Sequence, residues 1–224
     1  LENFRKGTLE KLGIGYDVMS EINPKIILCE ISGYGRTGPY SDKGGFDLVA
    51  QGMSGLMSIT GESKDKPPMK VGAPITDITA GLLASSGILA ALVHREKTGE
   101  GQKVDTSLFE AGIVHTYWQS AIAGATGHSP GPLGSAHPLT APYQAFKTKD
   151  KWITVGASNQ NTWLMLLKAI NRQDLQDDEK FSSNLNRKEN INELVDILNA
   201  ELIKKTSDEW LKIFDNNGLP CGPI

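Results

Sequence analysis

The sequence predicts an α/β fold in its first part and a smaller α+β module in its second part. Residues 25–32 form a short, β-branched apolar run that ends in Gly-rich sequence, which is typical of a buried strand. Residues 77–97 carry the strongest helical pattern, and residues 103–108 alternate as a strand does. Strand, helix and strand in this order indicate part of a parallel sheet.

Further helices are expected around this unit. Residues 1–24 carry apolar side chains at helical spacing with Gly and Pro breaks, which predicts two short helices. Residues 46–57 and 109–125 predict one helix each. The helix at 77–97 should end at the two glycines of residues 99–101.

The amino-acid composition of the chain changes between residues 126 and 142. This segment is dense in Gly, Pro and Ser, and it predicts a linker or an active-site loop. It separates a first domain, residues 1–125, from a second and incomplete domain, residues 143–224.

The second domain begins with a predicted hairpin. Residues 143–158 read as two strands with Lys149 and Asp150 near the turn. Three helices are expected after it, in residues 161–170, 188–203 and 206–214. Thr206 and Glu209 have the spacing of a capping box at the start of the last helix.

Composition excludes several classes of partner. The chain has 224 residues, 39% of them hydrophobic, and 23 basic against 26 acidic residues give a net charge of −3. No basic stripe is present, so neither nucleic acid nor an anionic membrane surface is expected as a partner. The longest apolar stretch, residues 78–93, is rich in Gly, Ala and Ser, and we expect it to be too short to span a bilayer.

Cysteine usage and the chain ends bear on localisation. Cys29 and Cys221 lie far apart and in no metal-like spacing, which indicates free thiols in a reducing compartment. We therefore expect the cytoplasm or the mitochondrial matrix. The sequence starts at Leu1 without Met, so we expect a fragment whose targeting segment would be invisible.

The segment "GYGRTG" has the G-x-G-x-x-G spacing of a dinucleotide fingerprint directly after a strand. That fingerprint needs a helix to open at once, and Pro39 with further glycines prevents it here. A flexible loop is the favoured interpretation. Its glycines would let the backbone approach a phosphate, with Arg36 and Lys43 nearby as cations.

Other motifs are weaker. Ser54 comes within one residue of a nucleophile elbow and is more simply a small residue in a helix. The four histidines are scattered without ligand spacing, so no metal site is expected. His137 lies in the Gly/Pro-rich segment and is kept as a candidate, although an ordinary surface histidine is the commoner case.

Asp77 precedes a long apolar run, and its position allows two interpretations. Asp is among the best helix N-caps, so a lone Asp at a helix start is usually a cap. The same place suits a nucleophilic carboxylate, because the helix dipole favours the ionised form and nearby N–H groups can stabilise an oxyanion. Position alone leaves both open.

Five ordered stretches together resemble the class III CoA-transferase family, which includes formyl-CoA transferase and the carnitine-related CoA-transferases. They are "ENFRKGTLEKLGIGYD", "NPKIILCEISGYGRTGPYSDKGGFDLVAQ", "SGLMSITG", "VGAPITDITAGLLASSGILAALVHREKTGEGQKVDTSLFEA" and "AHPLTAPYQAFKTKDKWITVGASNQ". "TGPY", "GLMSITG" and "PYQAFKTKD" look closest to the succinate-hydroxymethylglutarate CoA-transferase branch. The resemblance implies part of a Rossmann-like large domain, a small α+β domain, and an interlocked homodimer in the full-length protein.

The resemblance also implies roles for particular residues. The nucleophilic aspartate of the family's D-x-x-x-G falls on Asp77. The family's CoA contacts fall on Asn3, Phe4, Arg5, Lys11, Lys43, Gly44, Gly45 and Phe46. Gln51, Gly134 and His137 are the candidates for binding the acid substrate. Coenzyme A is then a substrate, and neither a cofactor nor a metal is expected.

The expected reaction moves CoA from an acyl-CoA, such as succinyl-CoA, to a free carboxylic acid. It proceeds through an aspartyl anhydride and an aspartyl-CoA thioester. Two alternatives remain: an acyl-CoA racemase or isomerase of the same superfamily, and a truncated, inactive binding module. Phe46 stands where the related racemases have a catalytic His, and Phe cannot carry a proton, which disfavours the first alternative.

Overall fold

A computed structural model describes all residues, 1–224, and divides the chain into two compact units. The first unit is Leu1–Pro132 and the second is Leu133–Ile224. The boundary between the two units falls inside the Gly/Pro-rich segment 126–142.

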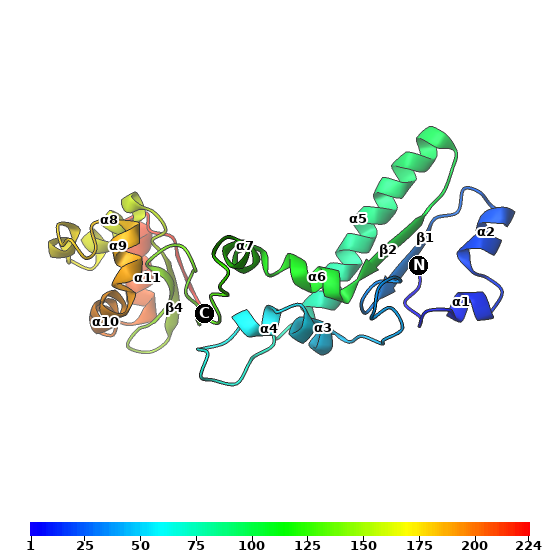
Figure 1. Cartoon of the computed structure of the whole chain (residues 1–224). Coiled ribbons are helices and arrows are strands. Elements are labelled where there is room, and N and C mark those ends of the chain that lie inside the picture. Colours follow the sequence, from blue (N-terminus) through cyan, green and yellow to red (C-terminus); the bar gives the residue numbers. More distant parts are fainter. The chain divides into compact units, whose positions relative to one another are not determined.

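The first unit is built on two parallel strands, and a long helix lies in the connection between them (Figure 1). β1 (Leu28–Ser32) pairs with β2 (Lys103–Ser107) in parallel, with Leu28 opposite Lys103 and Ser32 opposite Ser107. The connection contains α5 (Ile75–Thr98), which packs against both strands. The predicted order of strand, helix and parallel strand is therefore confirmed.

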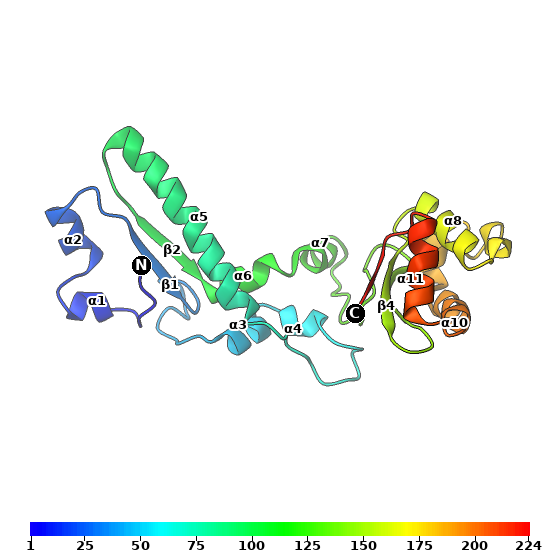
Figure 2. The same cartoon turned by 180° about the vertical axis from the view of Figure 1, so that it is seen from behind.

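Helix α5 contacts its strands closely. A Cβ on Gly87 would lie 2.6 Å from Cγ1 of Val104 in β2, so the helix approaches the strand at a position where only glycine fits. The helix ends at Gly99, whose φ of 80° is the left-handed cap that the sequence predicts. Figure 2 shows the same packing from behind.

The helix is also longer than the sequence pattern predicted. Its 24 residues are long and apolar enough, by length and composition alone, to cross a membrane. Contrary to the expectation from the sequence, the helix is not too short to span a bilayer. The helix packs against β1, β2, α3 (Asp47–Met53) and α6 (Leu108–Val114), as the core helix of an α/β unit does.

The short helices of the first unit match the prediction only in part. α1 (Thr8–Lys11) and α2 (Tyr16–Ile22) are the two short helices expected. The single helix predicted at 46–57 is wrong, because α3 ends at Met53 and α4 (Leu56–Ile59) begins after Gly55, whose φ is 86°. A residue in that conformation cannot continue a right-handed helix.

The helix predicted at 109–125 is also two helices. α6 ends at Val114, and α7 (Tyr117–Thr126) begins after Thr116. The hydroxyl of Thr116 donates to the Ile113 carbonyl oxygen at 2.8 Å, which competes with the helical hydrogen bonds at this point.

A small core joins three of these helices. Ala50 of α3, Ala80 of α5 and Ala111 of α6 are buried together with Leu108, and Ile31 of β1 packs against them. The short alanine side chains let the three helices approach closely. The start of α3, the start of α5 and the end of β1 are thereby held near one another.

The second unit contains a three-stranded antiparallel sheet. β3 (Tyr143–Lys147) and β4 (Trp152–Gly156) form the predicted hairpin. β5 (Cys221–Pro223) pairs with the other edge of β4 and was not predicted, because three residues carry too little pattern.

Helices complete the second unit: α8 (Gln160–Ala169), the 3₁₀ turn η1 (Gln173–Gln176), α9 (Asn184–Glu189), α10 (Ile191–Leu202) and α11 (Ser207–Asn216). The helix predicted at 188–203 starts later than expected, since α9 and α10 are separated at Asn190. The capping box of Thr206 and Glu209 is confirmed. Trp163, Phe146, Leu194 and Phe214 are buried in one apolar core.

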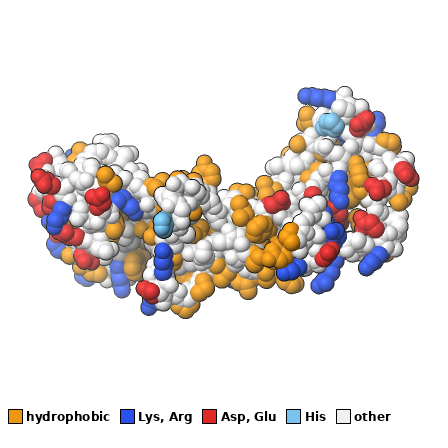
Figure 3. Space-filling model, viewed as in Figure 1, with side chains coloured by type: hydrophobic (Ala, Val, Ile, Leu, Met, Phe, Trp, Pro, Cys, Tyr) orange, Lys and Arg blue, Asp and Glu red, His pale blue; other side chains and the backbone are white.

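Charge is mixed on the surface. On the face shown in Figure 3, basic and acidic side chains are interspersed in both units.

Helix α5 exposes a row of apolar side chains. Ile78, Leu82, Leu89 and Val93 are each between 49% and 64% exposed.

Candidate functional site

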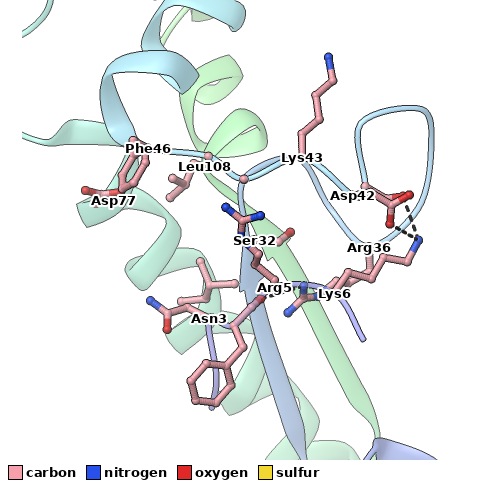
Figure 4. A pocket seen from close by; sticks show the side chains of 16 residues that line it. Asn3, Arg5, Lys6, Ser32, Arg36, Asp42, Lys43, Phe46, Asp77 and Leu108 are labelled. Atoms are coloured by element: carbon pink, nitrogen blue, oxygen red, sulfur yellow. Dashed lines mark hydrogen bonds and ion pairs between the residues drawn. The ribbon is translucent and has the colours of Figure 1, made fainter. Parts of the chain in front are cut away.

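The first unit contains a cavity of about 510 Å³ at the carboxyl ends of its two strands (Figure 4). Ile31 and Ser32 from the end of β1, and Leu108 directly after β2, lie in its wall. In open α/β sheets, ligands bind beyond the carboxyl ends of the strands. The remaining lining residues are Asn3, Phe4, Arg5, Lys6, Gly33, Arg36, Ser41, Asp42, Lys43, Gly44, Gly45, Phe46 and Asp77.

The N-terminal segment is held against β1 by backbone pairing. The Glu2 N–H donates to the Cys29 carbonyl oxygen at 2.9 Å, and the Ile31 N–H donates to the Glu2 carbonyl oxygen at 2.9 Å. This pairing places Asn3, Phe4 and Arg5 at the cavity wall. The Phe4 side chain is 53% exposed, so it is available to a ligand.

Arg36 does not offer a free cation to a phosphate, contrary to the expectation from the sequence. Its guanidinium is buried, pairs with the carboxylates of Glu2 and Glu30, and donates to the Phe4 carbonyl oxygen at 3.1 Å. Lys103 also pairs with Glu30. Arg36 therefore fixes the N-terminal segment.

Other cations do face the cavity. Arg5 makes no ion pair within the chain, and Lys43 lies over the Tyr40 ring at 4.1 Å from its centroid. Lys6 donates to the Ser41 hydroxyl at 2.9 Å and lies 3.7 Å from an Asp42 carboxylate oxygen. Arg5 and Lys43 are thus the cations most available to an anionic ligand.

Two glycine loops meet in the cavity wall. A Cβ on Gly45 would lie 2.5 Å from Cα of Gly33, and a Cβ on Gly33 would lie 2.7 Å from Cα of Gly45. The loop after β1 therefore contacts the loop before α3, backbone to backbone. No helix opens after β1 until Asp47, so the dinucleotide interpretation of "GYGRTG" is excluded.

Asp77 is not the N-cap of α5. Pro74 occupies that position, and Asp77 is the third residue of the helix. Its side chain is exposed to the cavity and its carboxylate accepts no hydrogen bond in the chain. In Figure 4 it is drawn with Phe46 at one end of the cavity, with Lys6 and Arg36 toward the other. Phe46 is 77% exposed.

Electrostatics around Asp77 favour a basic carboxylate. Partial burial, with a smaller contribution from the negative charge of Asp47, raises the pKa of Asp77 above its ordinary value of 3.8. In its ionised form, a carboxylate of raised pKa is more basic and more nucleophilic than an ordinary one. The capping role, one of the two interpretations that the sequence left open for Asp77, is filled by another residue.

That residue is Asp47, which was not among the residues predicted from the sequence. Its Oδ1 accepts from the Thr76 N–H at 3.0 Å and from the Thr76 hydroxyl at 2.8 Å. Its Oδ2 accepts from Nε2 of Gln51 at 2.8 Å. Desolvation alone would raise the pKa of Asp47, but these hydrogen bonds, with the charge of Lys70, lower it below its ordinary value. Twenty-nine residues separate Asp47 from Thr76, so no local signal could have found the pair.

Four predicted residues lie away from the cavity. Lys11 is in α1 and does not line it. Gln51 is fully buried, and its Oε1 accepts from the Val71 N–H at 2.8 Å, so both ends of its amide are occupied. Gly134 and His137 belong to the second unit.

His137 has its own hydrogen bonds in the second unit. Its Nδ1 accepts from the N–H groups of Leu139 at 3.1 Å and Thr140 at 3.2 Å. Burial and the nearby charge of Lys188 lower its pKa. The two N–H donors make Nδ1 the acceptor nitrogen of the ring.

Comparison of the sequence with protein families identifies one match over the whole chain. The model of CoA-transferase family III covers residues 1–224. An acyl-CoA transferase from Fusarium pseudograminearum is 42% identical over 229 residues, which cover all of this chain and 49% of that protein. A succinyl-CoA:glutarate CoA-transferase from Mus musculus is 40% identical and covers all of this chain and 51% of that protein. The chain thus spans about half the length of these relatives.

Solved structures show the same fold. A CAIB/BAIF family protein from Brucella suis superposes with a TM-score of 0.84 at 36% identity, covering 100% of this chain and 59% of that one. Rv3272 from M. tuberculosis gives a TM-score of 0.87 at 29% identity, covering 99% of this chain and 58% of that one.

Proposed function

This chain belongs to CoA-transferase family III, and on that premise we propose that the full-length protein transfers coenzyme A from an acyl-CoA to a free carboxylic acid. The observation that carries the proposal is the cavity of the first unit. It gathers Asp77 with all the residues expected to contact CoA except Lys11. These residues come from three separate segments of the chain.

The proposed reaction is covalent and uses Asp77 as the nucleophile. Its carboxylate attacks the thioester carbonyl of the donor, and CoA leaves as a thiolate, which gives a mixed anhydride on Asp77. The thiolate then attacks the aspartyl carbonyl, the donor acid leaves as a carboxylate, and an aspartyl-CoA thioester remains. Each step forms one acyl bond and breaks one.

The acceptor acid reverses this sequence. Its carboxylate attacks the aspartyl thioester and releases the thiolate, which gives a second anhydride. The thiolate attacks the acceptor's acyl carbon, so the new acyl-CoA leaves and the Asp77 carboxylate is regenerated. A backbone N–H group beside Asp77 is proposed to stabilise the oxyanions, whereas the Thr76 N–H is already used by Asp47.

The remaining cavity residues are proposed to hold CoA. Arg5 and Lys43 supply positive charge for its phosphates, and the Gly44-Gly45 backbone allows close approach. Phe46 presents an exposed ring where α-proton exchange would need an acid or base, and Phe can be neither. This supports acyl transfer over racemisation. Coenzyme A is a substrate in this proposal, and no cofactor takes part.

The acids are proposed by analogy. Relatives that match the whole chain are named succinyl-CoA:glutarate and succinyl-CoA–D-citramalate CoA-transferases. We therefore expect succinyl-CoA as donor and a dicarboxylate as acceptor. An interlocked homodimer in the full-length protein, located in the cytoplasm or mitochondrial matrix, belongs to the same proposal.

The test is a screen of acids with the full-length protein. The protein is incubated with succinyl-CoA and one candidate acid at a time, and the CoA esters are identified by mass spectrometry. A new acyl-CoA formed with release of succinate supports the proposal. Exchange of the α-proton of an acyl-CoA in deuterated water without any acceptor acid would instead indicate an isomerase, and CoA binding without either reaction would indicate a binding module.

A further inference from the structure

We propose that Asp47 is the positioning residue that holds the first turn of α5, and with it Asp77, toward the cavity. This inference rests on the proposed function, because it assigns a role in the same reaction. Asp47 itself lies outside the cavity wall, so it acts through Thr76 and not on the substrate.

The first turn of α5 needs a cap from outside the helix. A helix leaves its first N–H groups without partners, and a side-chain oxygen at the N-cap usually satisfies one of them. Pro74 at the N-cap has no such oxygen. The carboxylate of Asp47 takes this role from α3, through both the N–H and the hydroxyl of Thr76, which is fully buried.

Asp47 is itself held in place by a second hydrogen bond. Gln51, one turn later in α3, donates to its free oxygen, and the same Gln51 accepts from the Val71 N–H. A chain of hydrogen bonds therefore runs from Val71 through Gln51 and Asp47 to Thr76. It fixes α3, the segment before α5 and the first turn of α5 relative to one another.

The consequence for Asp77 is twofold. Its carboxylate accepts no hydrogen bond of its own, so its direction depends on the turn that Thr76 anchors. The charge of Asp47 also opposes the charge of Asp77, and acylation of Asp77 removes that repulsion. Asp47 directly follows Phe46 at the start of α3. The same turn therefore places Phe46 in the cavity wall and holds the turn that carries Asp77.

Substitutions can distinguish the effect of these hydrogen bonds on activity from a general loss of stability. Asp47→Ala removes the cap. Asp47→Asn keeps an oxygen for Thr76 but turns an amide N–H group toward the N–H group of Gln51. The double variant Asp47→Asn/Gln51→Glu restores that contact, because the carboxylate introduced at position 51 accepts both from the amide introduced at position 47 and from the Val71 N–H.

The second unit supplies a matched control. There Asp150 accepts from the Ser207 N–H at 2.8 Å, so a carboxylate from another element binds an N–H group of the first turn of α11, in addition to the Thr206 capping box. Asp150→Ala removes the same kind of bond. We expect it to lower the melting temperature and to leave kcat per folded protein unchanged.

In the full-length protein, Asp47→Ala should lower kcat by about 100-fold, the effect of misplacing a reacting group by about 1 Å. The KM for the acyl-CoA should change little, since the CoA-contacting wall remains. The double variant should recover most of the kcat. Equal kcat values for Asp47→Ala and Asp150→Ala, or a double variant as slow as Asp47→Asn, would overturn the inference.

A second readout does not depend on the reaction. The Thr76 N–H should be protected from hydrogen exchange in the wild type and should exchange faster in Asp47→Ala. If the wild type transfers no CoA, the proposed function fails, while this protection still supports the role of Asp47 in holding the turn. Rapid exchange of Thr76 in the wild type would refute that role whatever the activity.

Discussion

Gly33 and Gly45 contact each other backbone to backbone, and a Cβ on Gly45 would lie 2.5 Å from Cα of Gly33. The contact joins the loop after β1 to the loop before α3. It brings Lys43, Gly44 and Phe46 to the end of the sheet where Asp77 lies. Neither glycine has a positive φ, so the requirement is for space and not for backbone conformation.

Replacing Gly45 by alanine should therefore destabilise the protein. The added methyl group meets backbone, which cannot rotate away, and overpacking of this kind costs about 1 to 3 kcal/mol. Gly44→Ala is the matched control, because its Cβ would lie 3.6 Å from the Arg5 guanidinium, an ordinary contact. Urea unfolding of both variants checks this, and equal free energies of unfolding would show that the loops do not need the close approach.

Arg5 and Lys11 should differ in their effect on CoA affinity. Arg5 lines the cavity without an ion pair, whereas Lys11 lies outside it. Arg5→Met should weaken CoA binding about 10-fold, the loss of one charge-assisted hydrogen bond of about 1.5 kcal/mol. It should also make binding less sensitive to salt. Lys11→Met should change neither quantity.

Calorimetric titration of CoA at two ionic strengths measures both effects. The observation that would contradict the assignment is a Lys11→Met variant weakened as much as Arg5→Met. That result would restore the contact that the family resemblance placed on Lys11.

Asp47 and Asp77 should affect stability with opposite dependence on pH. The pKa of Asp47 is lowered in the folded protein. Its carboxylate therefore stabilises the fold at pH values above the ordinary pKa of 3.8, and this stabilisation is lost as the pH falls through the folded pKa. The folded pKa of Asp77 is raised, so its ionisation as the pH rises through that value destabilises the fold.

Asp47→Asn should thus lower the free energy of unfolding at neutral pH and change it less below pH 3.8. Asp77→Asn should modestly stabilise the protein at neutral pH, because it removes a charge that partial burial and, to a smaller extent, the charge of Asp47 disfavour. Urea unfolding of each variant and of the wild type, from acidic to neutral pH, gives the difference in the free energy of unfolding. The sign of that difference tests each prediction. A destabilising Asp77→Asn at neutral pH would contradict the described electrostatics.

Local patterns in the sequence were sufficient for much of the fold. β1, α5, β2 and the β3–β4 hairpin follow from periodicity, and the capping box of Thr206 from spacing. The breaks in three predicted helices were missed, because Gly55, Thr116 and Asn190 interrupt patterns whose apolar spacing continues across them. β5 forms because β4 offers it an edge, which no three-residue pattern reveals.

The site was predictable only in part, for a similar reason. The family resemblance found the residues that the structure brings together around Asp77. It did not find Asp47, whose partner lies 29 residues away, or the burial of Arg36 between Glu2 and Glu30. Gln51 was expected to bind substrate, whereas its amide is used within the chain. Such roles depend on tertiary contacts that a single sequence does not display.

The most direct test of the account is to trap the covalent intermediate at Asp77. The full-length protein is incubated with succinyl-CoA and hydroxylamine, which converts an aspartyl thioester or anhydride to a stable hydroxamate, and the labelled peptide is sequenced by mass spectrometry. We predict a hydroxamate at Asp77 in the wild type and no transfer by Asp77→Asn. Near-normal transfer by Asp77→Asn, or an active wild type left unlabelled at Asp77, would contradict it.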